Sequence, residues 1–229
     1  MKKNMILAAA LAAVVGLAGV SQAVPTSVIL TSGDLVGNSG WRVTFSPGIS
    51  LTYDEGLSTG PELVLEKAAD FQSDEGLDIA FTQVSYSASP TISITDETLF
   101  NQSGSNWGGF QFLLRDFDNG LTSPSFGSGP AFAGSTPPFG SQADTSNTIT
   151  LGSGNLADGG TTQWGYGPTG GELTINGAPS TSGIKQVFTL KEIPVVAAVP
   201  LPAAGWTGLS GLLGLGLIAG ARRVRRLMA

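Results

Sequence analysis

The chain contains neither cysteine nor histidine among its 229 residues. Without cysteine no disulfide can form, so burial of a hydrophobic core must hold the folded part together. Without histidine the chain cannot build a Ser-His-Asp or Cys-His catalytic site, an HExxH zinc site or an imidazole pH switch. An enzyme made from this sequence would use carboxylate, lysine, tyrosine or serine chemistry. A His-free secreted glycoside hydrolase with paired carboxylates is therefore one alternative function.

Basic side chains are scarce and lie mostly at the two ends of the chain. Six of the 11 lysines and arginines occupy positions 2, 3, 222, 223, 225 and 226, whereas all 17 acidic residues lie between positions 34 and 192. Removing those six from 11 leaves five basic against 17 acidic residues in 24–202, a formal net charge of −12. Such a surface repels nucleic acid and favours solubility outside the cell. We expect no nucleic-acid partner.

The first 23 residues have the three parts of a secretory signal peptide. Lys2 and Lys3 form a positive start, residues 6–20 form an apolar run, and Ser21 and Ala23 are the small residues that precede a cleavage site. The sequence therefore predicts export through the inner membrane of a Gram-negative-type bacterium, with residues 1–23 as the signal helix.

A second apolar segment lies near the other end of the chain, and its flanks differ. Residues 203–221 carry no charge, and a helix of that length reaches about 28 Å, close to the hydrocarbon thickness of a bilayer. The arginine cluster follows at once, in the basic tail 222–229. By the positive-inside rule this cluster stays in the cytoplasm. We expect a transmembrane helix over 203–221 with the preceding domain outside, and both terminal helices detached from that domain.

Two prolines stand immediately before the predicted span. Pro200 and Pro202 force extended backbone on themselves and on the residues before them, so the stretch "VPLPA" at 199–203 is an extended strip beside the membrane. Within the predicted linker 193–202 no folded element is expected. The sorting signal would comprise Val199, Pro200, Leu201, Pro202, Ala203, Arg222, Arg223, Arg225 and Arg226.

This order of motif, span and arginine cluster resembles the PEP-CTERM class of bacterial sorting signals, in its VPLPA-CTERM variant. Leu201 stands where the common form has glutamate. The resemblance implies recognition and cleavage near the motif by an exosortase-type membrane protease. It also implies a transient membrane anchor, delivery to the cell surface or the medium, and association with exopolysaccharide in a biofilm.

The sequence predicts a single all-β domain over residues 24–192. Short β-branched and aromatic runs alternate with Gly, Ser, Asn, Asp and Pro turns, which favours an antiparallel β-sandwich or jelly roll. Residues 61–71 come closest to a helical pattern and could instead form a short helix. A further strand begins at Trp107, with Phe110, Phe112 and Leu114 on one face. The other predicted strands cover 26–30, 41–45, 49–53, 62–66, 77–86, 91–95, 147–151, 171–175 and 184–190.

The residues around Trp107 carry a second, shorter resemblance. Asn101, Ser103, Gly104 and Trp107 are similar to the "NNTGxxW" hairpin of many sandwich domains that have such sorting tails. We expect Trp107 either to anchor the core or to form a platform on which a sugar stacks.

Two long stretches rich in Gly, Ser, Pro and Thr are predicted as loops. The first, 117–146, contains Phe126, Phe132 and Phe139, which should pack it along the sheet. The second, 152–171, contains Trp164 and Tyr166, the best candidates for carbohydrate contact; alternatively, Trp164 closes the end of the sandwich.

Metal and cofactor signals are weak. Asp116 and Asp118 stand two apart before Asn and Gly, as in an oxygen-ligand calcium loop, but no downstream glutamate completes the set, and an ordinary turn explains them equally. A similar acidic cluster lies at 73–78. We predict no cofactor and no catalytic residue. The sequence thus favours an exported, non-catalytic surface or extracellular-matrix protein, with a carbohydrate-binding module as the alternative.

Overall fold

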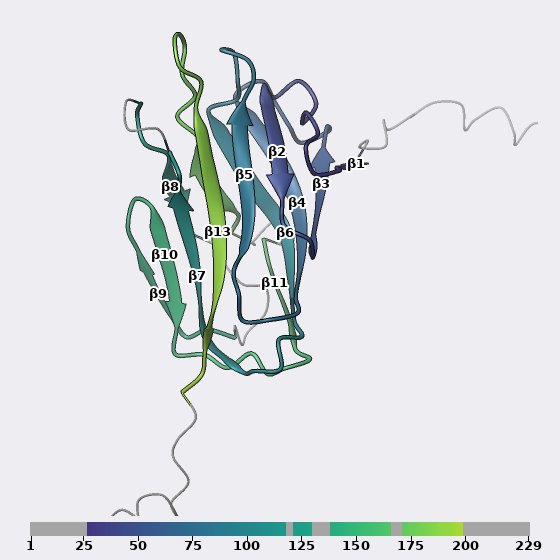
Figure 1. Cartoon of the computed structure of the whole chain (residues 1–229), viewed down its shortest axis with the longest axis vertical. Coiled ribbons are helices and arrows are strands. Elements are labelled where there is room, and N and C mark those ends of the chain that lie inside the picture. The colour runs from purple at the N-terminus through teal and green to yellow at the C-terminus, as the bar shows by residue number, and fades with distance from the viewer. Residues whose placement is uncertain (1–26, 118–120, 130–137, 166–170, 199–229) are drawn as a thin grey trace, which may run out of the picture.

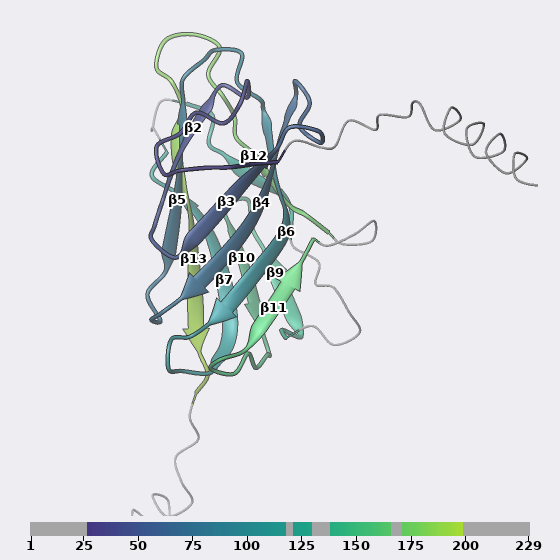
Figure 2. The same ribbon diagram turned by 90° about the vertical axis from the view of Figure 1, so that its right-hand side faces the viewer.

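A computed structural model describes residues 27–117, 121–129, 138–165 and 171–198. Within these ranges every regular element is a β-strand, and the strands form two sheets that lie face to face (Figures 1 and 2). The prediction of a sandwich-like all-β fold is confirmed at this level. Among the same residues no helix is long and apolar enough to cross a bilayer. The predicted signal peptide 1–23, sorting signal and span 203–221 lie outside the described residues.

Among the described residues, the first sheet has seven strands in the order β1-β3-β4-β6-β12-β8, with β11 also paired to β6. Figure 2 shows β3, β4, β6 and β11 in front. The strands are β1 (Ser27–Ile29), β3 (Ile49–Asp54), β4 (Glu62–Phe71), β6 (Thr91–Asn101), β8 (Ser125–Ser128), β11 (Thr161–Trp164) and β12 (Leu173–Asn176).

One pairing in this sheet corrects the prediction of a purely antiparallel fold. Strands β4 and β6 are parallel neighbours, whereas the other pairs are antiparallel. Between them the chain crosses to the opposite sheet, forms β5 there and returns. Two successive reversals restore the original direction, so β6 runs alongside β4 in the same sense.

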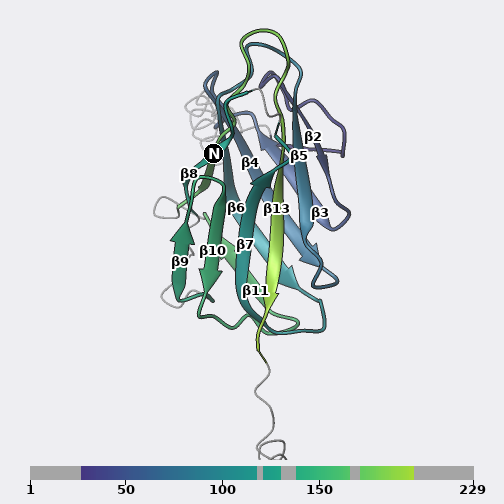
Figure 3. The same ribbon diagram turned by 60° about the vertical axis from the view of Figure 1, so that its left-hand side comes forward.

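In the part of the chain that the structure describes, the second sheet has six strands, all antiparallel, in the order β2-β5-β13-β7-β10-β9. Figure 3 shows β13 between β5 and β7, in the middle of the layer. The strands are β2 (Trp41–Phe45), β5 (Leu77–Gln83), β7 (Trp107–Arg115), β9 (Ser141–Asp144), β10 (Thr148–Gly152) and β13 (Val187–Val196).

The core lies between the sheets because alternate residues of each strand point inward. In β7 the predicted inward row Phe110, Phe112 and Leu114 is buried. The aromatic rings there meet edge to face, with the centroids of Phe110 and Phe112 5.2 Å apart. Near the other end of the sandwich, Phe81 and Phe188 stack with centroids 5.0 Å apart.

Strand β4 settles the alternative between strand and helix over 61–71. Its inward positions Leu63, Leu65, Ala69 and Phe71 are buried and repeat every second residue. A helix would have scattered these side chains over its circumference, whereas a strand puts them all on the core side.

Strand β13 extends beyond the predicted domain end at 192, so residues 193–196 of the predicted linker belong to the sandwich. Pro194 disfavours the prediction of a strand here, because proline has no N–H group to pair in a sheet. Pairing with β5 ends at Glu192, however, and at Pro194 only β7 is paired to the strand, through Phe110. The proline is therefore tolerated where one side of the strand is open.

The predicted loops also contain short strands. Within 117–146 the chain forms β8 and β9, and Phe126 and Phe139 pack against the core. Within 152–171 it forms β11, which pairs with β6. Polar edge strands of this length have too few apolar residues to show in the sequence pattern. Phe132 and Tyr166 lie outside the described residues.

Candidate functional site

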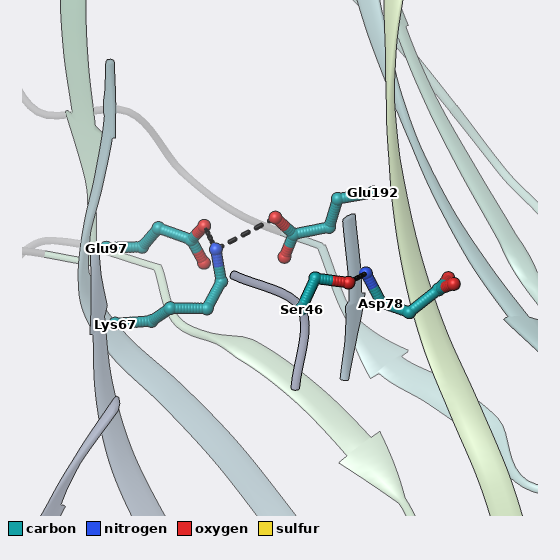
Figure 4. A network of polar contacts seen from close by, with 5 residues as sticks. All are labelled: Ser46, Lys67, Asp78, Glu97 and Glu192. Carbon is teal, nitrogen blue, oxygen red and sulfur yellow. Dashed lines mark hydrogen bonds and ion pairs between the residues drawn. The ribbon is translucent and has the colours of Figure 1, made fainter. Parts of the chain in front are cut away.

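The charged residues at the centre of the core form one network, the Lys67–Glu97–Glu192 network. Lys67 comes from β4 and Glu97 from β6 in the first sheet, and Glu192 comes from β13 in the second. The Lys67 ammonium contacts Glu97 Oε1 and, at 2.8 Å, Glu192 Oε2 (Figure 4). All three side chains are fully buried. The network thus joins two sheets through the middle of the sandwich.

The local register explains why these side chains face inward. Lys67 follows Leu63 and Leu65 in the inward row of β4, and Glu192 follows Phe188 and Leu190 in that of β13. Strand β6 needs an irregularity to add Glu97, because its inward row begins at even positions, Ile92 and Ile94, and continues at odd ones.

A bulge supplies this change of parity. Glu66 pairs with Thr95 and Ala68 with Thr98, so the register of β4 and β6 shifts opposite Lys67. A bulge redirects the side chains that follow it to the other face of the strand. Glu97 consequently points into the core beside Lys67, as do Leu99 and Asn101 after it.

Two carboxyl groups share a single ammonium in this network, so its charges are not balanced. Burial lowers the pKa of Lys67, and the charge and hydrogen bond of Glu192 oppose that shift. Burial likewise raises the pKa of Glu192 against the attraction of Lys67. Glu97 Oε2 and Glu192 Oε1 are buried without a hydrogen-bond partner. The environment therefore favours the neutral forms of Lys67 and Glu192, and burial closes the network to an external substrate.

The residues of the predicted hairpin also come together, in a turn between β6 and β7. The buried Asn101 side chain donates hydrogen bonds to the carbonyl oxygens of Ser105, Leu156 and Ala157 at 2.8, 3.0 and 3.1 Å. Its Oδ1 accepts from the Ser103 hydroxyl at 2.9 Å. The Trp107 indole N–H donates to that hydroxyl at 3.1 Å. These contacts fix the turn to the 152–160 loop.

Acidic residues surround the same turn. The Asp158 carboxylate accepts from the Gly104 amide at 3.0 Å. Hydrogen bonds from Ser103 and Ser105 lower the pKa of Asp74. Asp78, from the same 73–78 cluster, instead pairs with Arg115 at 3.0 Å. Asp158 and Asp78 thus each have a structural contact.

The structure corrects part of the predicted glycan site. Trp107 and Trp164 have no exposed surface. The Trp164 ring packs edge to face on Phe112 with centroids 5.2 Å apart. A sugar stacks on an open aromatic face, so neither indole can bind a glycan in this structure. Both are core anchors, the other role considered for them. The third candidate, Tyr166, lies outside the described residues.

The calcium candidates are not brought together with other ligands. Asp116 adopts the left-handed region at φ 61°, and its carboxylate pairs with Arg115 Nε at 3.2 Å. Asp118 lies outside the described residues. Within 27–117, 121–129, 138–165 and 171–198, no three acidic side chains gather in an arrangement that could hold a metal ion.

A polar hollow that no sequence pattern predicted lies beside the β3–β4 connection. The hollow has a volume of about 280 Å³. Glu62, at its edge, accepts a 2.6 Å hydrogen bond from Ser93. Burial and the Glu62 charge raise the pKa of nearby Glu172. The lining residues are hydroxyl, amide and carboxyl side chains with one tyrosine and one glycine: Asn38, Ser39, Tyr53, Glu55, Ser58, Thr59, Gly60, Glu62 and Ser89.

Comparison of the chain with protein-family models, with curated proteins and with solved structures finds no match. The class of the protein is therefore given by its fold, a sandwich-like all-β domain of two sheets. Its particular feature is a charged network closed inside the core.

Proposed function

We propose that this chain is an exported, non-catalytic surface or extracellular-matrix protein that is processed at a VPLPA-type C-terminal sorting signal. The observation that carries the proposal is the order of segments after the folded domain. Strand β13 ends at Val196, and the motif at 199–203 follows almost at once. The uncharged segment 203–221 and the arginine cluster come directly after it. This order suits a membrane-embedded sorting protease as the processing partner.

The end of β13 gives further support. Val196 is paired with Trp107, and the Ala197 amide donates to the Asn106 carbonyl oxygen at 2.8 Å. The strand therefore leaves the sandwich at the end formed by the Asn101–Trp107 turn, at the bottom of Figure 1. A protease that cleaves an extended strip needs that strip outside the folded layers, and this exit supports such access.

The acidic surface and the closed core support the matrix role. The formal charge of −12 in 24–202 favours solubility outside the cell and attraction of divalent cations. The buried lysine and glutamates are inaccessible to a soluble substrate. An extracellular polysaccharide is the polymer with which we expect the protein to associate.

The decisive experiment is to express the full chain in its native host and to measure the intact mass of the protein recovered from the cell surface or the medium. We expect the mature form to start after residue 23 and to lack 203–229. The double variant Pro200→Ala/Pro202→Ala should leave the precursor in the membrane. The control Pro61→Ala, at an exposed proline, should be processed normally. A mature surface form that retains 203–229 would contradict the proposal.

The polar hollow favours a second candidate, a carbohydrate-binding module. Carboxylates, hydroxyls and an amide around a hollow are the hydrogen-bonding groups that orient a sugar. Binding of the purified chain to a glycan array tests this role. Glu55→Gln should weaken any binding severalfold if the hollow is the site, with Glu75→Gln as the exposed control. Binding that is unchanged in Glu55→Gln would place the sugar elsewhere.

A further inference from the structure

The Lys67–Glu97–Glu192 network combines a nucleophile, an acyl acceptor and a proton carrier in a place that water does not reach. The Lys67 nitrogen contacts one carboxyl oxygen of Glu97 and one of Glu192, and all three side chains have no exposed surface. The second oxygen of each carboxyl group is buried without a hydrogen-bond partner. If this arrangement served only as a salt bridge, two of its carboxyl oxygens would stay buried without a hydrogen bond, which is unfavourable.

We propose that Lys67 and Glu97 condense within the folded domain to form an amide cross-link between β4 and β6, with Glu192 as the proton carrier. The cross-link is a covalent modification of the chain by its own residues. It does not depend on export or on the sorting signal.

The reaction needs no other reactant. The neutral Lys67 amine attacks the Cδ atom of the protonated Glu97 carboxyl group, and a C–N bond forms. Glu192 takes the proton that the nitrogen loses and passes it to the departing hydroxyl group as the C–O bond breaks. One water molecule leaves, and Glu192 ends in the protonation state in which it began. No oxidation or reduction occurs.

The core supplies the conditions that this step requires. Condensation needs an unprotonated amine and a group that takes up and returns a proton; burial lowers the pKa of Lys67 and raises that of Glu192, the proton carrier. The fold holds the reacting groups in contact, which replaces a bimolecular encounter by an intramolecular one. The amide product contains no ammonium, and Glu97 keeps one buried carboxyl oxygen instead of two.

The geometry favours Glu97 over Glu192 as the acceptor. Lys67 and Glu97 lie on hydrogen-bonded neighbouring strands, and the bulge in their register aims Glu97 at Lys67. Glu192 instead reaches across the space between two sheets, from β13. The amide would join positions 30 apart in a chain that has no cysteine to form a disulfide.

The test is mass spectrometry of the purified full chain. We expect an intact mass about 18 Da below that of the unmodified polypeptide, the loss of one water. Trypsin should fail to cut after Lys67 and should release residues 43–115 as one peptide, also about 18 Da lighter than its sequence predicts. Fragmentation of this peptide should give no fragments from cleavage between Lys67 and Glu97. An unreduced mass for the folded chain overturns the proposal. A link from Lys67 to Glu192 overturns the assignment of Glu97 as the acceptor.

Two variants show whether the network makes the bond. Lys67→Gln removes the nucleophile, and we expect its full unmodified mass. Glu192→Gln keeps both reacting groups and removes the proton carrier, so most of that variant should stay unreacted. The matched control Lys191→Gln should show the same loss of water as the wild type. A loss of water that persists in Lys67→Gln arises elsewhere in the chain and overturns the proposal.

Discussion

Lys67 and Glu192 come from opposite sheets, and an ion pair of 2.8 Å between Nζ and Oε2 joins them across the buried core. Most sandwich interiors are filled with apolar side chains, because moving an ion out of water costs roughly several kcal/mol of hydration free energy even when the ion is paired. A lysine retained at this position, with two carboxyl partners, is the feature that most distinguishes this domain.

Replacing Lys67 by methionine should destabilise the domain and make its stability depend on pH. The change leaves two buried carboxyl groups, and we expect a loss of about 3–5 kcal/mol near neutral pH. Burial holds the folded-state pKa of Glu192 above its unfolded value of about 4.3. The folded state therefore binds the proton more tightly, and stability falls as the pH rises from 5 to 8.

Urea denaturation of Lys67→Met at pH 5 and pH 8 measures this effect. The neighbouring half-buried Lys191 provides the control, because Lys191→Met should change the free energy of unfolding by only about 0.5 kcal/mol. An equal loss at both pH values in Lys67→Met would show that the remaining carboxyl groups carry no charge-dependent penalty.

Asn101 should be essential to the turn from which β13 leaves the sandwich. Its side-chain amide donates to three carbonyl oxygens, so Asn101→Ala leaves buried acceptors unsatisfied and should cost about 2–3 kcal/mol. The free energy of unfolding in urea gives the loss. The exposed neighbour Gln102, changed to alanine, should cost far less, and similar losses for the two variants would argue against this role of Asn101.

Trp164 should contribute to stability through its buried ring. Trp164→Ala removes a fully buried ring that packs on Phe112, and we expect a loss of about 3–5 kcal/mol. Tyr86 is about half exposed, at 48%, and Tyr86→Ala should cost much less. Thermal and urea unfolding compare the two variants. A stable Trp164→Ala protein that has lost glycan binding would contradict the burial seen here and restore the carbohydrate role.

Gly48 should resist substitution because of its backbone conformation and its surroundings. Its φ is +91°, and a Cβ atom there would lie 2.6 Å from the Asp70 carbonyl oxygen. Gly48→Ala should therefore cost more than about 1 kcal/mol. Gly60 has open space around it and no positive φ, so Gly60→Ala is the control and should be nearly neutral. Chemical denaturation of the two variants makes the comparison, and equal stabilities would remove the argument from strain.

The residue pattern predicted much of the two-sheet fold and little of the charged site. The strand at 91–95 and the inward row from Phe110 to Leu114 were predicted because alternation along a strand is a local property. The same rule could have singled out Lys67 and Glu192, since each stands at an inward position of an apolar row. Glu97 could not be found this way, because the bulge before it changes the parity of the strand.

The sequence by itself determined the absence of thiol and imidazole chemistry, the excess of acidic side chains and the periodicity that makes the middle of the chain all-β. These are properties of composition and of near neighbours. Only the tertiary structure decided that Trp107 and Trp164 are buried, that β4 and β6 run parallel, and that Lys67 meets a carboxylate 125 positions away. Those outcomes depend on how two sheets pack against each other, and contacts between distant segments are not encoded in any local spacing.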